Sequence, residues 1–222
     1  MIHLDFETRS ELELRGPNSA GLDNYAKHPS TAALMLAWAI DEEPVQLWEI
    51  AKGESIPRRL LISLKDSKQE LLAWNSAFER NMFLRKLGMD LPAWRWQDPQ
   101  ASARYLSLPA SLEDVGPILG LSPEMLKDKE GDRLIGVFSE LTIPRKKRAK
   151  KGEVSVQQAP YFRDWITDPE DWQRFGDYCR RDVISEREIM RRLSILKVFP
   201  LPERERRIWL LDQKINDAGI PT

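Results

Sequence analysis

The sequence of 222 residues predicts an α/β fold in which a mixed sheet is flanked by helices. Three observations support this. The first half alternates short apolar runs with turn formers, the middle joins strand-like segments to segments with helical periodicity, and the second half is mostly helical in pattern. With 41% hydrophobic and 31% charged residues, the composition is typical of a soluble globular protein with one large domain, or one domain plus an appendage.

The first half predicts a three-stranded antiparallel meander. Residues 3–10 ("HLDFETRS") have the pattern of a first strand. After the turn-rich residues 21–30, two apolar runs follow at 31–40 ("TAALMLAWAI") and 44–48 ("PVQLW"), with Asp-Glu-Glu-Pro near their junction. Short apolar runs separated by such turn formers favour sequential strands.

The middle of the chain predicts parallel strands joined by crossover helices. Residues 56–66 have apolar side chains at helical spacing, and 70–74 ("ELLAW") is typical of a short buried strand. Residues 76–88 predict a helix closed by its terminal glycine, and 94–98 ("WRWQD") predict a further strand. The expected result is a mixed sheet.

The second half contains several helix-start signals. Ser111 and Asp114 have the spacing of a capping box, and Asp168 followed by Pro169 predicts a capped helix that runs to about Leu196. A last amphipathic helix is expected over residues 203–218. Its apolar positions are Ile208, Leu211 and Ile215.

Composition excludes several classes of function. The net charge of −1 gives no overall attraction to a polyanion, and the single Cys179 permits no intrachain disulfide, which favours a reducing, cytoplasmic setting. His3 and His28 are too few for a three-histidine zinc site. The longest apolar stretch, residues 32–40, is too short to span a bilayer, so no membrane association is expected.

Two acids lie in the first predicted strand. Asp5 and Glu7 alternate with apolar residues, so their side chains point to the same face. Two like charges held together are unfavourable unless they are solvated at a strand end, share a proton or bind a cation. Both a solvated strand end and a cation site are compatible with this pattern.

Two other segments carry acids next to aromatic side chains. Tyr178 precedes Asp182 by four residues, so both lie on one helical face. Asn75 ends the predicted strand at 70–74, and Phe78 and Glu79 fall on the first turn of the next helix, where the helix dipole also favours an acid. The order of these motifs along the chain is more specific than any one of them.

The motifs "DFET", "NSAFE" and "YCRRD" resemble those of the DEDD superfamily of 3′–5′ exonucleases, in its tyrosine branch, a DnaQ-like group with a ribonuclease H-like fold. That branch includes the proofreading domains of DNA polymerases. The resemblance covers residues 1 to about 196. The segment 201–222 is similar to the connection between exonuclease and polymerase domains in phage or prophage family A-like polymerases. We therefore expect an exonuclease domain over 1–200, a connecting helix over 201–222, and a polymerase domain further along the full-length chain.

The resemblance implies a site for two divalent ions, Mg²⁺ or Mn²⁺, whose preferred ligands are hard oxygens. Asp5 would bridge both ions. Glu7 and Asp182 would bind the ion that activates water, Glu79 would hold the second ion, and Tyr178 would orient the nucleophile. The family usually has aspartate in the second motif, where this sequence has Glu79, whose side chain is one methylene longer.

The resemblance also suggests substrate contacts. Thr8 would meet the terminal 3′ hydroxyl, Asn75 would contact the substrate, and Phe78 would pack against the last base or sugar unless it belongs to the core. Asp98, at the end of its predicted strand, is a reserve acid or a supporting residue of the site.

A basic run interrupts the apolar pattern. Six of the seven residues 145–151 are Lys or Arg, within a predicted loop or hairpin at 144–160. Arg145, Lys146 and Lys147 are candidates for contacts with backbone phosphates, which would make binding salt-dependent. The alternative is a solvated loop with no partner.

The function expected from the sequence is metal-dependent 3′–5′ hydrolysis of single-stranded DNA ends in proofreading, by a monomer. Three alternatives stay open: an RNA-trimming nuclease of the ribonuclease D type, a catalytically silent module that binds nucleic acid, and a helical DNA-binding protein led by the basic run. The last leaves the ordered acids unexplained.

Overall fold

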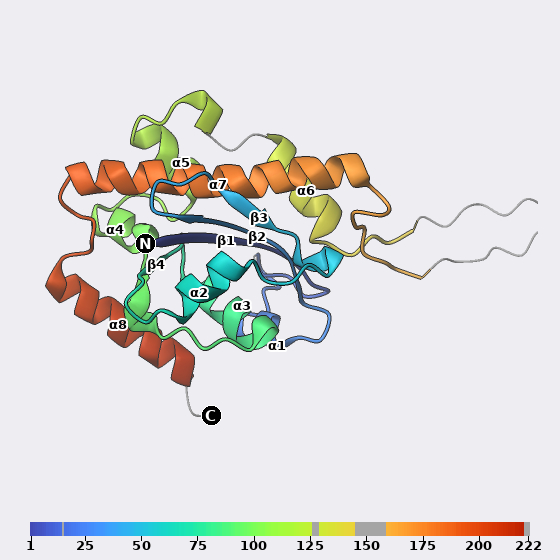
Figure 1. Cartoon of the computed structure of the whole chain (residues 1–222), viewed down its shortest axis with the longest axis horizontal. Coiled ribbons are helices and arrows are strands. Elements are labelled where there is room, and N and C mark those ends of the chain that lie inside the picture. The colour runs from blue at the N-terminus through green and yellow to red at the C-terminus, as the bar shows by residue number, and fades with distance from the viewer. Residues whose placement is uncertain (15, 126–128, 145–158, 220–222) are drawn as a thin grey trace, which may run out of the picture.

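A five-stranded sheet forms the centre of the protein. The computed structural model describes residues 1–14, 16–125, 129–144 and 159–219 (Figure 1). The strands are β1 (Ile2–Arg9), β2 (Ala32–Ile40), β3 (Gln46–Trp48), β4 (Leu71–Leu72) and β5 (Trp96–Gln97). Their order in the sheet is β3-β2-β1-β4-β5, which places β1 at the centre.

The sheet is mixed, as predicted. β1 and β2 pair antiparallel from Ile2 opposite Ile40 to Arg9 opposite Ala32, with a bulge between Glu7 and Thr8. β2 and β3 are also antiparallel, whereas β4 pairs parallel to both β1 and β5. The antiparallel meander and the parallel strands are therefore confirmed.

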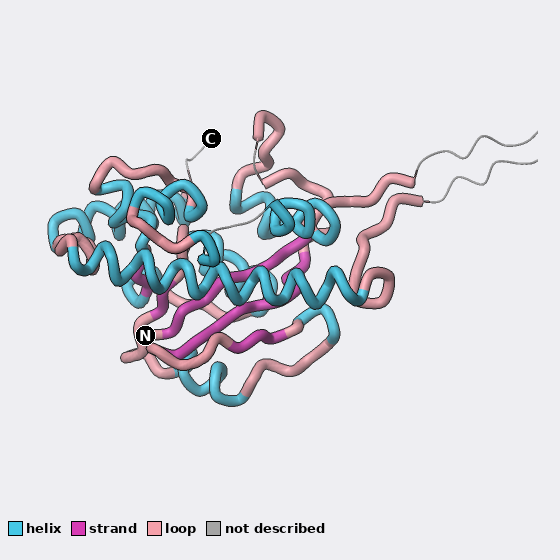
Figure 2. The backbone as a smooth tube through the Cα atoms, turned by 90° about the horizontal axis from the view of Figure 1, so that it is seen from above, coloured by secondary structure: helices cyan, strands magenta, loops and turns pink. Residues whose placement is uncertain are grey.

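Helices cover both faces of the sheet. The α-helices are α1 (Leu22–Lys27), α2 (Arg58–Lys65), α3 (Ala77–Leu87), α4 (Pro99–Tyr105), α5 (Leu112–Ile118), α6 (Lys129–Phe138), α7 (Pro169–Ile195) and α8 (Glu203–Ala218). Short 3₁₀ helices are η1 (Ile50–Lys52), η2 (Ala93–Arg95) and η3 (Pro123–Met125). The long helix α7 lies along one face of the sheet (Figures 1 and 2), and α2 and α3 lie on the other (Figure 1). None of the helices in the described ranges has the length and apolar character needed to cross a bilayer.

Apolar clusters on both faces of the sheet hold these layers together. Leu4 and Phe6 of β1 pack with Leu60 of α2 and Phe83 of α3 in the first cluster. On the other face, α6 and α7 contribute large side chains to a second cluster with β2, among them Phe175, which stacks on Phe138 at 5.2 Å. The face of β1 that is turned toward α7 is different, since it carries the acids.

The helix ends follow the sequence signals, with one correction. Gly88 closes α3 with φ 66°, and the Ser111 hydroxyl accepts a hydrogen bond from the Asp114 amide at 3.4 Å. α7 begins at Pro169 as predicted, but the Asp168 side chain makes no cap hydrogen bond. Its carboxylate instead accepts a hydrogen bond from Arg163 Nε at 2.7 Å, so a nearby cation replaces the amides as its partner.

The last helix, α8, is present where it was predicted, but it does not pack through its apolar stripe. Ile208, Leu211 and Ile215 are 52%, 58% and 54% exposed. The buried side instead includes Gln213, whose Oε1 accepts a hydrogen bond from Arg80 at 2.8 Å. Amphipathic periodicity therefore predicted the helix correctly and did not identify the face that packs.

Candidate active site

One face of β1 carries only titratable side chains over five residues. His3, Asp5 and Glu7 alternate with apolar neighbours, so all three point toward α7. His3 is 2% exposed and Glu7 9% exposed, while Asp5 is partly exposed. His3 and Glu7 are therefore covered by the packing of α7, whereas Asp5 keeps some contact with solvent.

Helix α7 presents a matching row to this strand. Tyr178, Asp182 and Glu186 are spaced four residues apart and share one helical face. Two residues of strand advance about 6.6 Å. Four residues of helix advance about 6 Å, so the two rows stay in step along their length. The helix runs opposite to the strand, which brings Glu186 to His3 at one end of the row and Tyr178 toward Glu7 at the other.

The centre of the row is a tight group of donor atoms. One ligand atom each from Asp5, Glu7 and Cys179 lie within 4.8 Å of one another. The Cys179 sulfur is 3.5 Å from the Asp5 carbonyl and 3.6 Å from Asp5 Oδ2. Burial, and next the negative charges of Asp5 and Glu7, raise the pKa of Cys179, so the thiol keeps its proton and donates it. The hard ligand atoms of this group are thus the carboxylate oxygens.

Tyr178 and Asp182 share a side-chain hydrogen bond, and Tyr178 is close enough to Glu7 and Asp5 to be affected by their charges. Burial raises the pKa of Tyr178, and the charges of Asp182 and Glu7 raise it further. The phenol is therefore neutral and donates to the carboxylate. Gly131 of α6 approaches the Tyr178 ring so closely that an added Cβ would lie 2.3 Å from Cε2. The ring has no room to move toward α6.

Glu79 approaches the same acids from α3. It lies in the first turn of the helix and is 2% exposed. Burial raises its pKa, and the charge of Asp5 is the largest further contribution. In the part of the chain that the structure describes, Glu79 Oε2 is a buried atom with no hydrogen-bond partner. A carboxylate oxygen in this position requires a proton or a cation.

Asp98 supports the segment that leads to Glu79. Its carboxylate accepts hydrogen bonds from the backbone amides of Asn75 and Ser76, at 3.1 and 3.0 Å, and from the Gln100 amide at 3.0 Å. Asn75 has φ 64°, a left-handed conformation that Asn tolerates better than most residues. The carboxylate of Asp98 therefore stabilises the turn between β4 and α3.

Glu186 was not identified from the sequence. Its Oε2 accepts a hydrogen bond from the Trp74 amide at 2.6 Å, and its Oε1 lies 3.5 Å from His3 Nδ1. Burial raises the pKa of Glu186 and lowers that of His3 to about 3, so His3 is uncharged at neutral pH and the contact is not an ion pair. The available signal was its position one turn after Asp182 on the same face of the helix.

Of the residues predicted to contact the substrate, the structure describes Thr8, Asn75 and Phe78. The Thr8 hydroxyl is buried and lies 2.8 Å from the Tyr25 hydroxyl. Phe78 is half-buried with its ring 6.3 Å from that of Tyr25, and Asn75 is exposed. The basic residues predicted to contact phosphates, Arg145, Lys146 and Lys147, lie outside the described residues.

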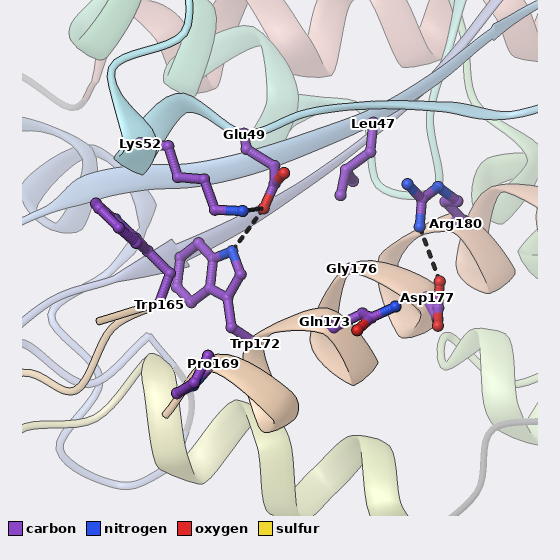
Figure 3. A pocket seen from close by; sticks show the side chains of 10 residues that line it. All are labelled: Leu47, Glu49, Lys52, Trp165, Pro169, Trp172, Gln173, Gly176, Asp177 and Arg180. Carbon is purple, nitrogen blue, oxygen red and sulfur yellow. Dashed lines mark hydrogen bonds and ion pairs between the residues drawn. The ribbon is translucent and has the colours of Figure 1, made fainter. Parts of the chain in front are cut away.

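A separate cavity of about 470 Å³ lies on the β3 side of α7 (Figure 3). Its charged groups pair with neighbours: Glu49 Oε1 lies 2.7 Å from Lys52 Nζ and accepts a hydrogen bond from Trp172 Nε1 at 2.7 Å. Arg180 likewise donates to Asp177 at 2.8 Å. None of the acids described above lines this cavity, so it is distinct from the acidic row.

The chain is similar in sequence to part of a known phage protein. No protein-family model matches it. Over 219 residues, 99% of the chain, it is 35% identical to the "DNA polymerase" of Bacillus phage SP02. The chain spans 31% of the length of that relative. It is therefore similar, over nearly its whole length, to one part of a phage DNA polymerase.

Proposed function

We propose that this chain is a metal-dependent 3′–5′ exonuclease that removes nucleotides from single-stranded DNA ends and proofreads for a DNA polymerase. The observation that carries the proposal is that carboxylates from three distant segments lie close together. These are Asp5 and Glu7 of β1, Glu79 of α3 and Asp182 of α7. The charge of Asp5 raises the pKa of Glu79, and the charges of Asp5, Glu7 and Asp182 raise the pKa of Tyr178 and Cys179. The order of motifs supports a ribonuclease H-like fold of the tyrosine branch, and the phage polymerase relative supports DNA as the substrate.

The residues fit a site for two hard divalent ions, Mg²⁺ or Mn²⁺. Carboxylate oxygens are the donors, and the unpartnered Oε2 of Glu79 is a ligand in need of a partner. Asp5, Glu7, Glu79 and Asp182 would hold the ions. When bound, such ions lower the pKa of water and neutralise charge at a scissile phosphate.

Tyr178 serves as a positioning donor in this proposal. Its raised pKa makes it a poor base at neutral pH, so the phenol donates hydrogen bonds and takes no proton. The hydrogen bond to Asp182 and the close approach of Gly131 hold the ring in one orientation. Because the one phenol proton points to Asp182, the phenol oxygen would orient an attacking water by accepting a hydrogen bond from it.

Substrate would enter beside Asn75 and Phe78. Asn75 is exposed and Phe78 is half-buried next to Tyr25, so both offer surface to a terminal nucleotide. Thr8 would reach a 3′ hydroxyl from beside Tyr25. The acids are largely buried, so the end of a DNA strand must leave its duplex to reach them. An unpaired end therefore reaches the site at a lower cost in free energy than a paired one.

The partner would be a polymerase domain of a longer chain, since the relative is about three times as long as the matched region. In this arrangement residues 1–200 form the exonuclease and residues 201–222 the connecting helix. The exposed side of α8 would then lie near that domain.

The test uses 5′-labelled single-stranded DNA and RNA of the same sequence, with Mg²⁺, Mn²⁺ or a chelator. We expect a metal-dependent ladder that shortens from the 3′ end of the DNA, and no ladder with Asp5→Ala. Glu11→Ala, a change of an exposed acid soon after β1, is the matched control and should cleave normally.

Two results would contradict the proposal. Strong preference for RNA would favour the ribonuclease D-like alternative and remove the proofreading role. Binding of DNA without cleavage under any metal condition would favour a catalytically silent module.

A further inference from the structure

Three consecutive backbone amides at the end of β4 donate to side-chain carboxylates. Trp74 N donates to Glu186 at 2.6 Å, and the amides of Asn75 and Ser76 donate to Asp98. Strand β4 ends at Leu72, so the sheet does not supply acceptors for these groups. A buried amide without an acceptor is costly, and the conformation of residues 74–76 therefore depends on the two carboxylates.

The two carboxylates come from different elements. Asp98 is the N-cap of α4 and is close in space to β4 through strand β5. Glu186 belongs to α7 and is 112 residues away from Trp74 in the sequence. The hydrogen bond between Glu186 and Trp74 is thus a direct connection from the helix that carries Asp182 to the segment that carries Glu79.

The hydrogen bond between Glu186 and Trp74 lies close in sequence to both Asp182 and Glu79. Glu186 lies one helical turn from Asp182, and α3 begins at Ala77, so Glu79 is only five residues from Trp74. The turn between them contains Asn75 in a left-handed conformation, which is maintained by its surroundings. A displacement of Trp74 would therefore be passed on to the start of α3.

We propose that Glu186 is a positioning residue that holds the turn at 74–76 against α7 and thereby sets the place of Glu79 relative to Asp182. This inference rests on the proposed function, in which both acids bind metal. Glu186 acts through its acceptor oxygen toward the Trp74 amide, with His3 as the neighbour of its other oxygen. Its charge is not required.

The experiment compares three variants of the same helix. Glu186→Gln keeps an acceptor for the Trp74 amide, whereas Glu186→Met fills a similar length without one. Glu188→Met is the control, because Glu188 pairs with Arg191 and Arg192 at the surface and not with the turn. Amide hydrogen exchange of the metal-free protein, calorimetric binding of Mn²⁺, and kcat and KM for DNA cleavage are measured for each.

We expect Glu186→Met to speed exchange at residues 74–76 by at least about tenfold and to weaken Mn²⁺ binding by about 10-fold to 100-fold, the usual effect of losing a group that orients a metal ligand. The value of kcat should fall by a similar factor, with KM changed by less than about twofold, because the turn and not the DNA surface is altered. Glu186→Gln and Glu188→Met should stay within about threefold of wild type in every measurement.

Two outcomes would overturn the proposal: wild-type exchange and Mn²⁺ binding in Glu186→Met, or a Glu186→Gln variant as impaired as Glu186→Met. If Glu186→Met does not fold, Glu186→Leu and the Gln variant are compared in its place. Failure of the exonuclease proposal is distinguishable, since a wild-type protein that neither cleaves nor binds Mn²⁺ refutes that function, while the exchange measurement still decides whether Glu186 holds the turn.

Discussion

The two faces of β1 are both buried, yet they differ in almost every other property. Toward α2 and α3 the strand presents Leu4, fully buried, and Phe6, 5% exposed, in an apolar cluster. Toward α7 it presents His3, Asp5 and Glu7. Burial of each apolar side chain stabilises the fold by about 1.5–3 kcal/mol, whereas burial of neighbouring carboxyls opposes their ionisation.

The difference separates stability from chemistry within one strand. The apolar face packs the sheet against its helices. On the titratable face, burial and the charge of Asp5 raise the pKa of Glu79, Cys179 and Glu186. A change on one face should therefore alter folding, and a change on the other should alter activity. Four predictions test this separation.

The largest effect is expected from Asp5→Asn. After burial, the charge of Asp5 is the largest cause of the raised pKa of both Glu79 and Cys179, and Asp5 belongs to the tight group of donors. We expect 3′–5′ cleavage to fall by at least about 10³-fold, since an amide is a poor substitute for a shared anionic ligand. The melting temperature without metal should be equal to that of wild type or higher, because a repulsive charge is removed. Cleavage above about a tenth of the wild-type rate would contradict this.

The opposite face should respond in the opposite way. Leu4→Ala removes a fully buried side chain between the sheet and the helices, and should lower the free energy of unfolding by about 2–5 kcal/mol in urea denaturation. Cleavage per folded molecule should stay within about twofold of wild type, because the cavity lies on the far side of the strand. A selective loss of activity in a fully folded variant would show that the two faces are coupled.

A smaller effect is expected from Gly131→Ala, which tests whether the position of Tyr178 matters. The new methyl group would lie 2.3 Å from the ring, so the ring must move relative to Asp182. We expect kcat to fall by about 10-fold to 100-fold, as for a displacement of about 1 Å in a catalytic group. Gly136→Ala is the control on the same helix, since no atom lies within 4 Å of its added Cβ. Equal activity in the two variants would contradict a positioning role for the tyrosine.

The smallest effect concerns pH. The pKa of Glu79 is raised in the folded protein, so above its unfolded value near 4.5 the folded state retains a proton that the unfolded state has lost. Metal-free wild type should therefore lose stability relative to Glu79→Gln as the pH rises, by up to about 1.4 kcal/mol per pH unit, until the folded pKa is passed. His3, whose pKa is lowered to about 3, has the opposite pH dependence below about 6.5 and cancels in this comparison. Parallel stability curves for the two proteins from pH 5 to 9 would refute the prediction.

Local patterns were sufficient for most of the fold. Alternation placed Asp5 and Glu7 on one face of β1, and the spacing of four placed Tyr178 beside Asp182, because both patterns follow from the geometry of one element. The strands, the helix ends at Gly88 and Ser111, and the start of α7 also follow from neighbours in sequence.

Side-chain contacts outside a single element were not predicted from the sequence. Asp168 has the signature of a cap, but its carboxylate accepts a hydrogen bond from Arg163 in the loop before α7, and α8 exposes the apolar stripe that was expected to pack. Each outcome depends on which part of the folded protein lies next to the residue or helix, and a periodic sequence pattern does not contain that information.

Sequence patterns therefore identified the strands in their order, the longest helices and the three segments that carry the candidate site, but they indicated turns at residues 21–30, where the structure has helix α1. The packing of the layers was needed to show that α7 runs antiparallel to β1 with matched spacing, that Glu186 contacts Trp74 and His3, and that Asp98 faces the turn before α3. The two kinds of interaction differ in their separation along the sequence. Hydrophobic periodicity and capping involve residues a few positions apart. The hydrogen bond between the Glu186 carboxyl and an amide 112 residues away depends on how whole layers pack.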